Sequence, residues 1–347
     1  GEDGGRTGAS GPGQLDSVRQ IMARENVVFR QGDRVVRAEV AEFVTGARLA
    51  VLTGTPSIEV SGAYLTGDRV ESRDGEVIIE GSKGSGRAQM ILLDTGGLGL
   101  QGASALSSET IVLADRITLR EEPKQHRFLF SGRVEVFSGA VQLNADAMTI
   151  VAERGIGADM STGDVASDLR LGRVAQMEAR GSVRIEQSGQ IATGEVVTFY
   201  PDASRAVLEG QPKVTTETAV VTGARMELQP KLAVVRGDSS RPARVVLPEL
   251  PDLGYNGRLS GQKLEEEAGG VPATEDVQQA PTVIYAQLLN MIEAADETIF
   301  RFTDDVVVDA TNLLASCERL DVTATKEEAD FGGDAGGGTP LQVERIE

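Results

Sequence analysis

Two kinds of segment recur in tandem along this chain, and the recurrence limits the fold to an array of similar units. A shift of 156 residues aligns 18–81 with 174–237 without a gap, and 21 of the 64 aligned pairs are identical. A shift of 172 residues aligns 110–152 with 282–324. Self-similarity at a fixed spacing is typical of repeat architectures, in which each copy forms one structural unit. We therefore treat 110–152 as a first half-unit and 174–237 as a second half-unit.

Alternation of apolar and polar residues predicts that both half-units consist of β-strands. Val134 and Val136 alternate with Arg133 and Glu135, and similar short runs, separated by Gly, Asp, Asn or Ser, occur throughout the chain. A period of two places apolar side chains on one face of a strand and charges on the other. The sequence therefore predicts an all-β protein whose strands each have one dry face.

The order of the half-units predicts one complete unit flanked by partial ones. Stretches rich in Gly, Ser, Pro or acidic residues predict the connections, including one at 81–108. We expect a flexible tail at 1–14, a partial unit with its connector at 15–100, a complete unit at 107–248, a Pro/Gly-rich acidic linker at 249–281 and a truncated partial unit at 282–347. Such an order is typical of a window cut from a longer tandem array.

The charge balance and the rarity of His and Cys exclude several classes of function. The chain has 53 acidic and 34 basic residues, a net charge of −19. This argues against a nucleic-acid partner, because that binding depends on Lys and Arg that displace phosphate counterions. A single Cys and a single His exclude an internal disulfide and a Cys/His zinc cluster within this chain. We expect no metal, no cofactor and no catalytic residue, and no apolar run is long enough for a membrane-spanning helix.

Three polar features are predicted to have structural roles rather than catalytic or metal-binding ones. His126 lies in a polar turn before a predicted strand, so we expect it to be exposed. Cys317 aligns with Ala145, which predicts a half-buried position on a strand. Asp304 and Asp305 are expected at the solvated end of a hairpin rather than in a metal site.

The order of short motifs in the complete unit resembles a known family. The first-half motifs are residues 110–115 (TIVLAD), 130–136 (FSGRVEV) and 143–150 (LNADAMTI), and the second-half motifs are 192–199 (ATGEVVTF), 206–210 (AVLEG) and 221–226 (VTGARM). Together they resemble the two halves of the OstA-like domain of the lipopolysaccharide-transport periplasmic bridge proteins. The resemblance covers 107–237 directly, and the repeat alignment extends it to 18–81 and 282–347.

The resemblance implies a fold and a function. The fold is an antiparallel β-jellyroll, V-shaped and elongated, with an apolar trough for lipid acyl chains. The function is non-enzymatic transport of lipopolysaccharide or a related lipid between the inner and outer membranes, in the periplasm or in association with the outer membrane. The implied protein partners are other OstA-like or outer-membrane assembly proteins, joined by edge-strand pairing. The candidate trough-lining residues are Phe29, Phe43, Ile58, Phe130, Val136, Ile150, Ile185, Phe199, Phe302 and Val308.

Two other functions remain open from the sequence. The same apolar positions can form a closed core, which would make the chain a structural β-rich spacer or assembly scaffold of the cell envelope. Residues 94–96 (Asp-Thr-Gly) have the form of an aspartic-protease turn, but that chemistry needs two such carboxylates and the motif occurs once. Catalysis at Asp94 is therefore only a remote alternative.

Overall fold

The chain folds into antiparallel β-strands joined by short turns. The computed structural model describes residues 19–31, 34–60, 62–82, 86–93, 109–154, 171–187, 189–216, 219–247, 281–294, 297–310, 313–326 and 341–346. These residues form 25 strands and two short 3-10 turns, η1 (Thr45–Ala47) and η2 (Pro201–Ala203). The pairings between neighbouring strands are antiparallel throughout the described part, so the predicted all-β fold is confirmed. Among the described residues, no helix has the length and apolar character needed to cross a membrane.

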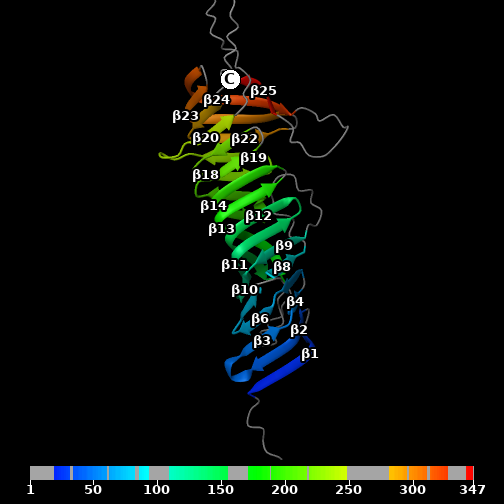
Figure 1. Cartoon of the computed structure of the whole chain (residues 1–347). Coiled ribbons are helices and arrows are strands. Elements are labelled where there is room, and N and C mark those ends of the chain that lie inside the picture. The colour runs from blue at the N-terminus through cyan, green and yellow to red at the C-terminus, as the bar shows by residue number, and fades with distance from the viewer. Residues whose placement is uncertain are drawn as a thin grey trace, which may run out of the picture.

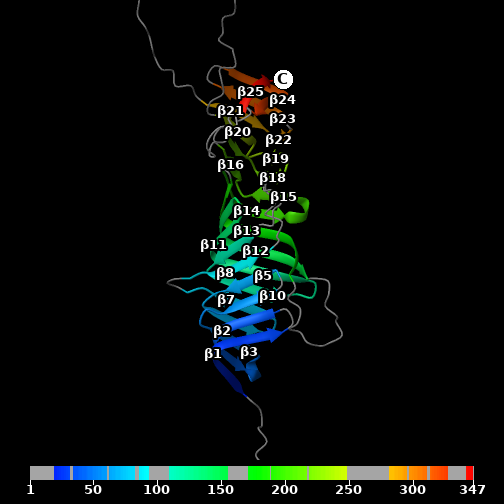
Figure 2. The same cartoon turned by 90° about the vertical axis from the view of Figure 1, so that its right-hand side faces the viewer.

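All the strands join one hydrogen-bonded network that forms an elongated stack. Strand β1 lies at one end and β25 (Leu341–Ile346) at the other, and both views show the same long axis (Figure 1, Figure 2). Long strands cross the whole width of the stack and bend partway. The long strands are β1 (Gln20–Gln31), β2 (Arg34–Val44), β11 (Gln125–Ser138), β12 (Val141–Arg154), β13 (Leu171–Gln187), β14 (Gln190–Tyr200), β23 (Glu297–Ala310) and β24 (Leu313–Lys326).

Shorter strands fill the intervals between the long ones and form two sheets, which we call sheet A and sheet B. Sheet A contains β3 (Leu49–Thr53), β6 (Arg69–Arg73), β7 (Glu76–Glu80), β10 (Arg116–Glu121), β15 (Arg205–Glu209), β18 (Arg225–Gln229), β19 (Leu232–Arg236) and β22 (Leu288–Glu293). Sheet B contains β4 (Ser57–Val60), β5 (Ala63–Thr66), β8 (Ala88–Leu92), β9 (Thr110–Ala114), β16 (Lys213–Thr215), β17 (Val220–Thr222), β20 (Ala243–Leu247) and β21 (Thr282–Ala286). Each bent strand contributes one half to each sheet: residues 40–44 of β2 pair with β3, whereas 35–37 pair with β4.

The two sheets meet along a corner where the long strands carry β-bulges. In β11, the pairing register shifts between Ser131 and Val134, and the intervening Gly132 and Arg133 have φ angles of 75° and 46°. An extra residue in one strand bends that strand and changes its direction. The bulges therefore let one strand leave sheet A and enter sheet B, which produces the V-shaped jellyroll that the resemblance implies.

The same corner explains the position of Asp304 and Asp305, which the sequence analysis placed at a hairpin end. Both residues lie in the middle of β23, where the register shifts between Thr303 and Val306, and their φ angles are 65° and 56°. Asp is one of the few residues that tolerate the left-handed region. The hairpin-end prediction is therefore wrong, and the pair forms the bulge of β23.

Strand positions recur at the two spacings found in the sequence. Strand β3 and strand β15 begin at Leu49 and Arg205, which are 156 residues apart, and β6 and β18 begin at Arg69 and Arg225, with the same separation. Strands β9 to β12 recur as β21 to β24 with a shift of 172 residues. The division into separate units stays a prediction. Strands on either side of the predicted boundaries pair with one another, β8 with β9 and β20 with β21 in sheet B, and β7 with β10 and β19 with β22 in sheet A.

One predicted connection is partly a strand. Residues 88–92 of the supposed connector 81–108 form β8, which pairs with β5 and β9 in sheet B. Ala88, Met90 and Leu92 point into the core, and the Gly/Ser-rich surroundings conceal this short alternating run. The tail at 1–14 and the linker at 249–281 lie outside the described residues.

Ion pairs lie on the outer faces of both sheets. One of them, between Asp321 and two arginines, predicts that stability depends on pH. Asp321 on β24 accepts hydrogen bonds from Arg319 and Arg301, with Nε–Oδ1 distances of 3.1 Å to each. The hydrogen bond from Arg319 is the main cause that lowers the pKa of Asp321 to about 2. Because the pKa is depressed in the folded state, the stabilisation is present above the ordinary Asp pKa and is lost as the pH falls through about 4 toward 2.

We expect Asp321→Asn to lower the free energy of unfolding at pH 7 by about 1 kcal/mol, since the two arginines are partly exposed and solvent screens the pair. Urea unfolding at pH 7 and at pH 2.5 measures the effect. The difference between wild type and variant should shrink at the lower pH, and an equal difference at both values would contradict this role of Asp321.

Candidate functional site

The interior between sheets A and B is the candidate site, and alternation along each strand builds it. In β11, the side chains of His126, Phe128 and Phe130 point inward from sheet A, and those of Val134 and Val136 point inward from sheet B. The residues between them face solvent. A single apolar cluster of such inward-facing residues extends from Val27 near one end of the stack to Val322 near the other.

The candidate trough-lining residues belong to this cluster or pack against it. Eight of them are buried, with exposed fractions of 8 % or less: Ile58, Phe130, Val136, Ile150, Ile185, Phe199, Phe302 and Val308. Phe29 and Phe43 are half-buried and pack against the cluster at its β1 end. Their rings meet edge to face, with centroids 5.1 Å apart, so an aromatic pair joins the sheet B half of β1 to the sheet A half of β2. Contact of any of these residues with lipid stays a prediction.

The interior is filled by side chains in this structure. A pocket between the sheets, lined by Arg34 and seven apolar residues from β4, β5, β7, β10 and β11, has a volume of about 10 Å³. That is about the room needed for a single water molecule. An acyl chain can enter only if sheets A and B move apart and exchange their mutual contacts for contacts with the ligand.

The backbone allows such a separation along one side of the stack. Hydrogen bonds tie the sheets together at the corner, for example from the Gly81 amide to the Asp115 carbonyl at 3.0 Å and from the Asp115 amide to the Gly132 carbonyl at 2.9 Å. On the side opposite the corner, the short strands of sheet A and those of sheet B are joined by separate turns, and we call this side the mouth. Within the described ranges, no strand pairing crosses this mouth, so no ladder of backbone hydrogen bonds between strands joins the two sheets there.

One charged residue, Arg34, lies against the apolar interior, and none of the predictions from the sequence concerned it. Arg34 begins β2 and shares the inward face with Val36 and Ala38. Burial lowers the pKa of its guanidinium from the ordinary value, and the negative charge of Glu121 offsets part of this shift. The sequence contains a pattern that predicts this orientation, because position 34 continues the alternation that places positions 36 and 38 on the inward face.

Two polar positions differ from their predictions. His126 was expected to be exposed, but it is buried, with an exposed fraction of 1 %. Strand β11 already begins at Gln125, so the imidazole lies on the same inward face as Phe128. Cys317 is exposed rather than half-buried. Its counterpart Ala145 is covered by β13, whereas β25 pairs only with residues 322–326 of β24 and leaves the region around Cys317 uncovered.

Two observations concern metal binding and the aspartic-protease alternative. No group of three or more His, Cys, Asp or Glu side chains among the described residues could hold a metal ion. Asp94 and the rest of its Asp-Thr-Gly motif lie outside the described residues.

Within the part of the chain that the structure describes, the two ends of the stack are open sheet edges. Strand β1 pairs only with β2, and β25 pairs only with β24, among the strands described. Strand β1 also exposes large apolar side chains, with exposed fractions of 49 % for Ile21, 48 % for Met22 and 46 % for Val28. Unpaired edges with apolar side chains are suited to continue the sheet with another chain.

The central part of the chain is similar to a known family of proteins. Residues 111–233, from β9 into β19, match the family described as LptA/(LptD N-terminal domain) LPS transport protein. The match agrees with the resemblance that the motifs of this segment indicated. No curated protein sequence matches the chain.

Among solved structures, the chain is similar to LptH from Pseudomonas aeruginosa, described as the LptA-homologous periplasmic component of the lipopolysaccharide transport device. The sequences are 16% identical, and the TM-score is 0.28. The aligned region covers 41% of this chain and 92% of LptH.

Proposed function

We propose that this chain carries lipopolysaccharide, or a related lipid, by holding its acyl chains between sheets A and B. The observation that carries the proposal is the match of residues 111–233 to the family of lipopolysaccharide-transport proteins. The geometry is consistent with it, because the apolar interior of that segment continues into the flanking strands on both sides. The chemistry is sequestration, and no bond is made or broken.

The energy of such binding comes from hydrocarbon removed from water. Each methylene buried contributes about 0.8 kcal/mol, or about 25 cal/mol per Å² of apolar surface. Opening the mouth costs the contacts between the sheets, and the acyl chains replace them with contacts of the same kind. Aliphatic and phenyl side chains such as Ile150 and Phe199 offer no polar partner that would hold a sliding chain at one position.

The proposal includes a place and partners for the protein. The open edges of β1 and β25 would pair with other OstA-like or outer-membrane assembly proteins, which would extend the interior across a chain-to-chain junction. We place the protein in the periplasm or in association with the outer membrane, because the matched family transports lipopolysaccharide.

A second candidate is a structural spacer of the cell envelope with the same units and a permanently closed core. The filled interior favours it, because the pocket of about 10 Å³ has no room for an acyl chain without movement of the sheets. The two functions differ in one property, namely whether the mouth opens for a lipid.

Photo-crosslinking with lipopolysaccharide distinguishes the two functions. We expect benzoylphenylalanine at Phe130 or Phe199, both buried in the interior, to crosslink to lipopolysaccharide in the purified chain. The matched control is Phe137 on the same strand β11, which faces outward and is 36 % exposed, and it should crosslink far less. Labelling restricted to Phe137, or absent from all three positions, would contradict the carrier and favour the spacer.

A further inference from the structure

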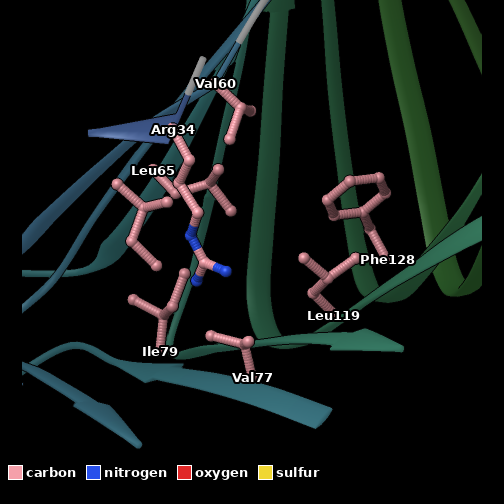
Figure 3. Close-up of a pocket in the computed structure, with 8 residues that line it drawn as sticks. Arg34, Val60, Leu65, Val77, Ile79, Leu119 and Phe128 are labelled. Atoms are coloured by element: carbon pink, nitrogen blue, oxygen red, sulfur yellow. The ribbon is translucent and has the colours of Figure 1, made fainter. Parts of the chain in front are cut away.

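Arg34 occupies an unusual place for an arginine. Its side chain extends from β2 into the space between the sheets, with the guanidinium next to Ile79 and Val77 of β7 and facing Leu119 and Phe128 (Figure 3). Arginine side chains beside apolar surface usually bury the stem and keep the charged end in water. Arg34 as a whole is half-buried, whereas its Nε atom is buried and has no hydrogen-bond partner among the described residues.

This arrangement leaves a cationic group only partly compensated. An arginine keeps its charge in proteins, so burial is tolerated only where an anion or hydrogen-bond acceptors offset it. Glu121, on the opposite wall in β10, supplies a negative charge that acts on Arg34. The seven other residues that line the pocket are all apolar.

The second copy of the same junction lacks this cation. The position equivalent to Arg34 under the 156-residue shift is Gln190, which is exposed. The fold therefore does not need an arginine at this place. Arg34 therefore distinguishes the junction at the β1 end from its second copy.

We propose that Arg34 binds the anionic group of a single-chain amphiphile, a carboxylate or phosphate monoester attached directly to an alkyl chain, whose chain lies in the apolar pocket between β4, β5, β7 and β10. The inference rests on the proposed function, because the sheets must separate to admit the chain. It deepens that function by naming a class of ligand, one in which the anion enters the interior together with the hydrocarbon. Two parallel N–H donors of a guanidinium match two oxygens of a carboxylate or phosphate.

Calorimetric titration of the full chain with three ligands of equal chain length tests the site: palmitate, hexadecyl phosphate and hexadecanol, each below its aggregation concentration. We expect both anions to bind about tenfold more tightly than the alcohol, or better, as for a charge-assisted hydrogen bond in a buried site. A preference for palmitate alone would assign the site to carboxylates, and one for hexadecyl phosphate alone would assign it to phosphates.

Variants at two positions of β2 locate the effect. Arg34→Gln installs the residue found in the second copy and should make the three ligands bind equally, whereas Arg34→Lys should retain a preference for the anions. The control Arg37→Gln lies on the outward face, where Arg37 pairs with Glu59 at 3.0 Å, and should leave the preference unchanged. Thermal unfolding verifies that each variant is folded.

The outcomes separate this inference from the function on which it rests. Equal binding of all three ligands to the wild type, or an anion preference that survives Arg34→Gln, overturns the role of Arg34 and leaves the carrier intact. If no single-chain ligand binds while lipopolysaccharide still crosslinks at Phe130, the single-chain site is also overturned. Loss of both the binding and the crosslink overturns the proposed function itself.

Discussion

We expect Phe130→Ala to lower the free energy of unfolding by about 3–5 kcal/mol, the usual cost of truncating a buried phenylalanine. Phe130 is 1 % exposed, and its strand neighbours on the same inward face are Ile117 of β10 and Met148 of β12. The alanine would leave a cavity that the surrounding strands fill only in part, because hydrogen bonds on both sides hold them. Urea unfolding followed by circular dichroism measures the loss.

Phe137→Ala is the matched control on the same strand. Phe137 faces outward and is 36 % exposed, so we expect a loss of at most about 1 kcal/mol. A loss below about 1 kcal/mol for Phe130→Ala would contradict a packed core at this level of the stack. It would also argue against the spacer function, because the interior would then be packed loosely enough to admit a ligand at a small cost in free energy.

The strands and their repetition were predictable because both depend on local pattern. Alternation such as Val134/Val136 against Arg133/Glu135 specifies which face of a strand is buried, and the structure places these valines inside at 1 % exposure. The bend of the long strands was not predictable in the same way. A bulge such as Asp304-Asp305 looks like a turn in the sequence, and only the pairing of β23 with β24 on both sides of the pair shows that the strand continues.

The candidate site was predictable as a set of inward-facing residues but not as an open or closed space. Burial of Ile150 and Phe302 follows from alternation, whereas the distance between the sheets depends on how side chains from distant strands fill the gap. The inward orientation of His126 and Arg34 was missed for a related reason. Both lie at strand ends, where a polar residue is usually assigned to the adjoining turn.

We expect Gly81→Ala to lower the free energy of unfolding by about 3 kcal/mol, because it places a methyl group against backbone at the corner of the fold. A Cβ at Gly81 would lie 2.5 Å from the Gly86 carbonyl oxygen and 2.6 Å from the Ala88 amide nitrogen. These atoms belong to the chain that passes from β7 in sheet A to β8 in sheet B, and they cannot rotate away as a side chain can. Overpacking that moves backbone costs about 1–3 kcal/mol or more.

Gly81→Ala also bears on how the sheets are joined. The Gly81 amide donates to the Asp115 carbonyl at 3.0 Å, and Asp115 in turn donates to Gly132, so the substitution disturbs the hydrogen bonds that hold the corner. If the corner is the fixed side of the V, its weakening should destabilise both sheets together in a single transition. Gly237 is the equivalent residue in the second copy, and a Cβ there would lie 2.7 Å from the Ala243 amide nitrogen. Gly237→Ala should therefore lower the free energy of unfolding by a comparable amount.

Gly46→Ala supplies the control for the loss of a glycine as such. Gly46 lies in η1, a Cβ there meets no atom within 4 Å, and its φ is not positive. Replacing such a glycine restricts the unfolded chain more than the folded one, so we expect no loss and a gain of up to about 1 kcal/mol. Equal stability of Gly81→Ala and Gly46→Ala would show that the passage from β7 to β8 has room to spare, and the corner could then not serve as the rigid side about which the mouth opens.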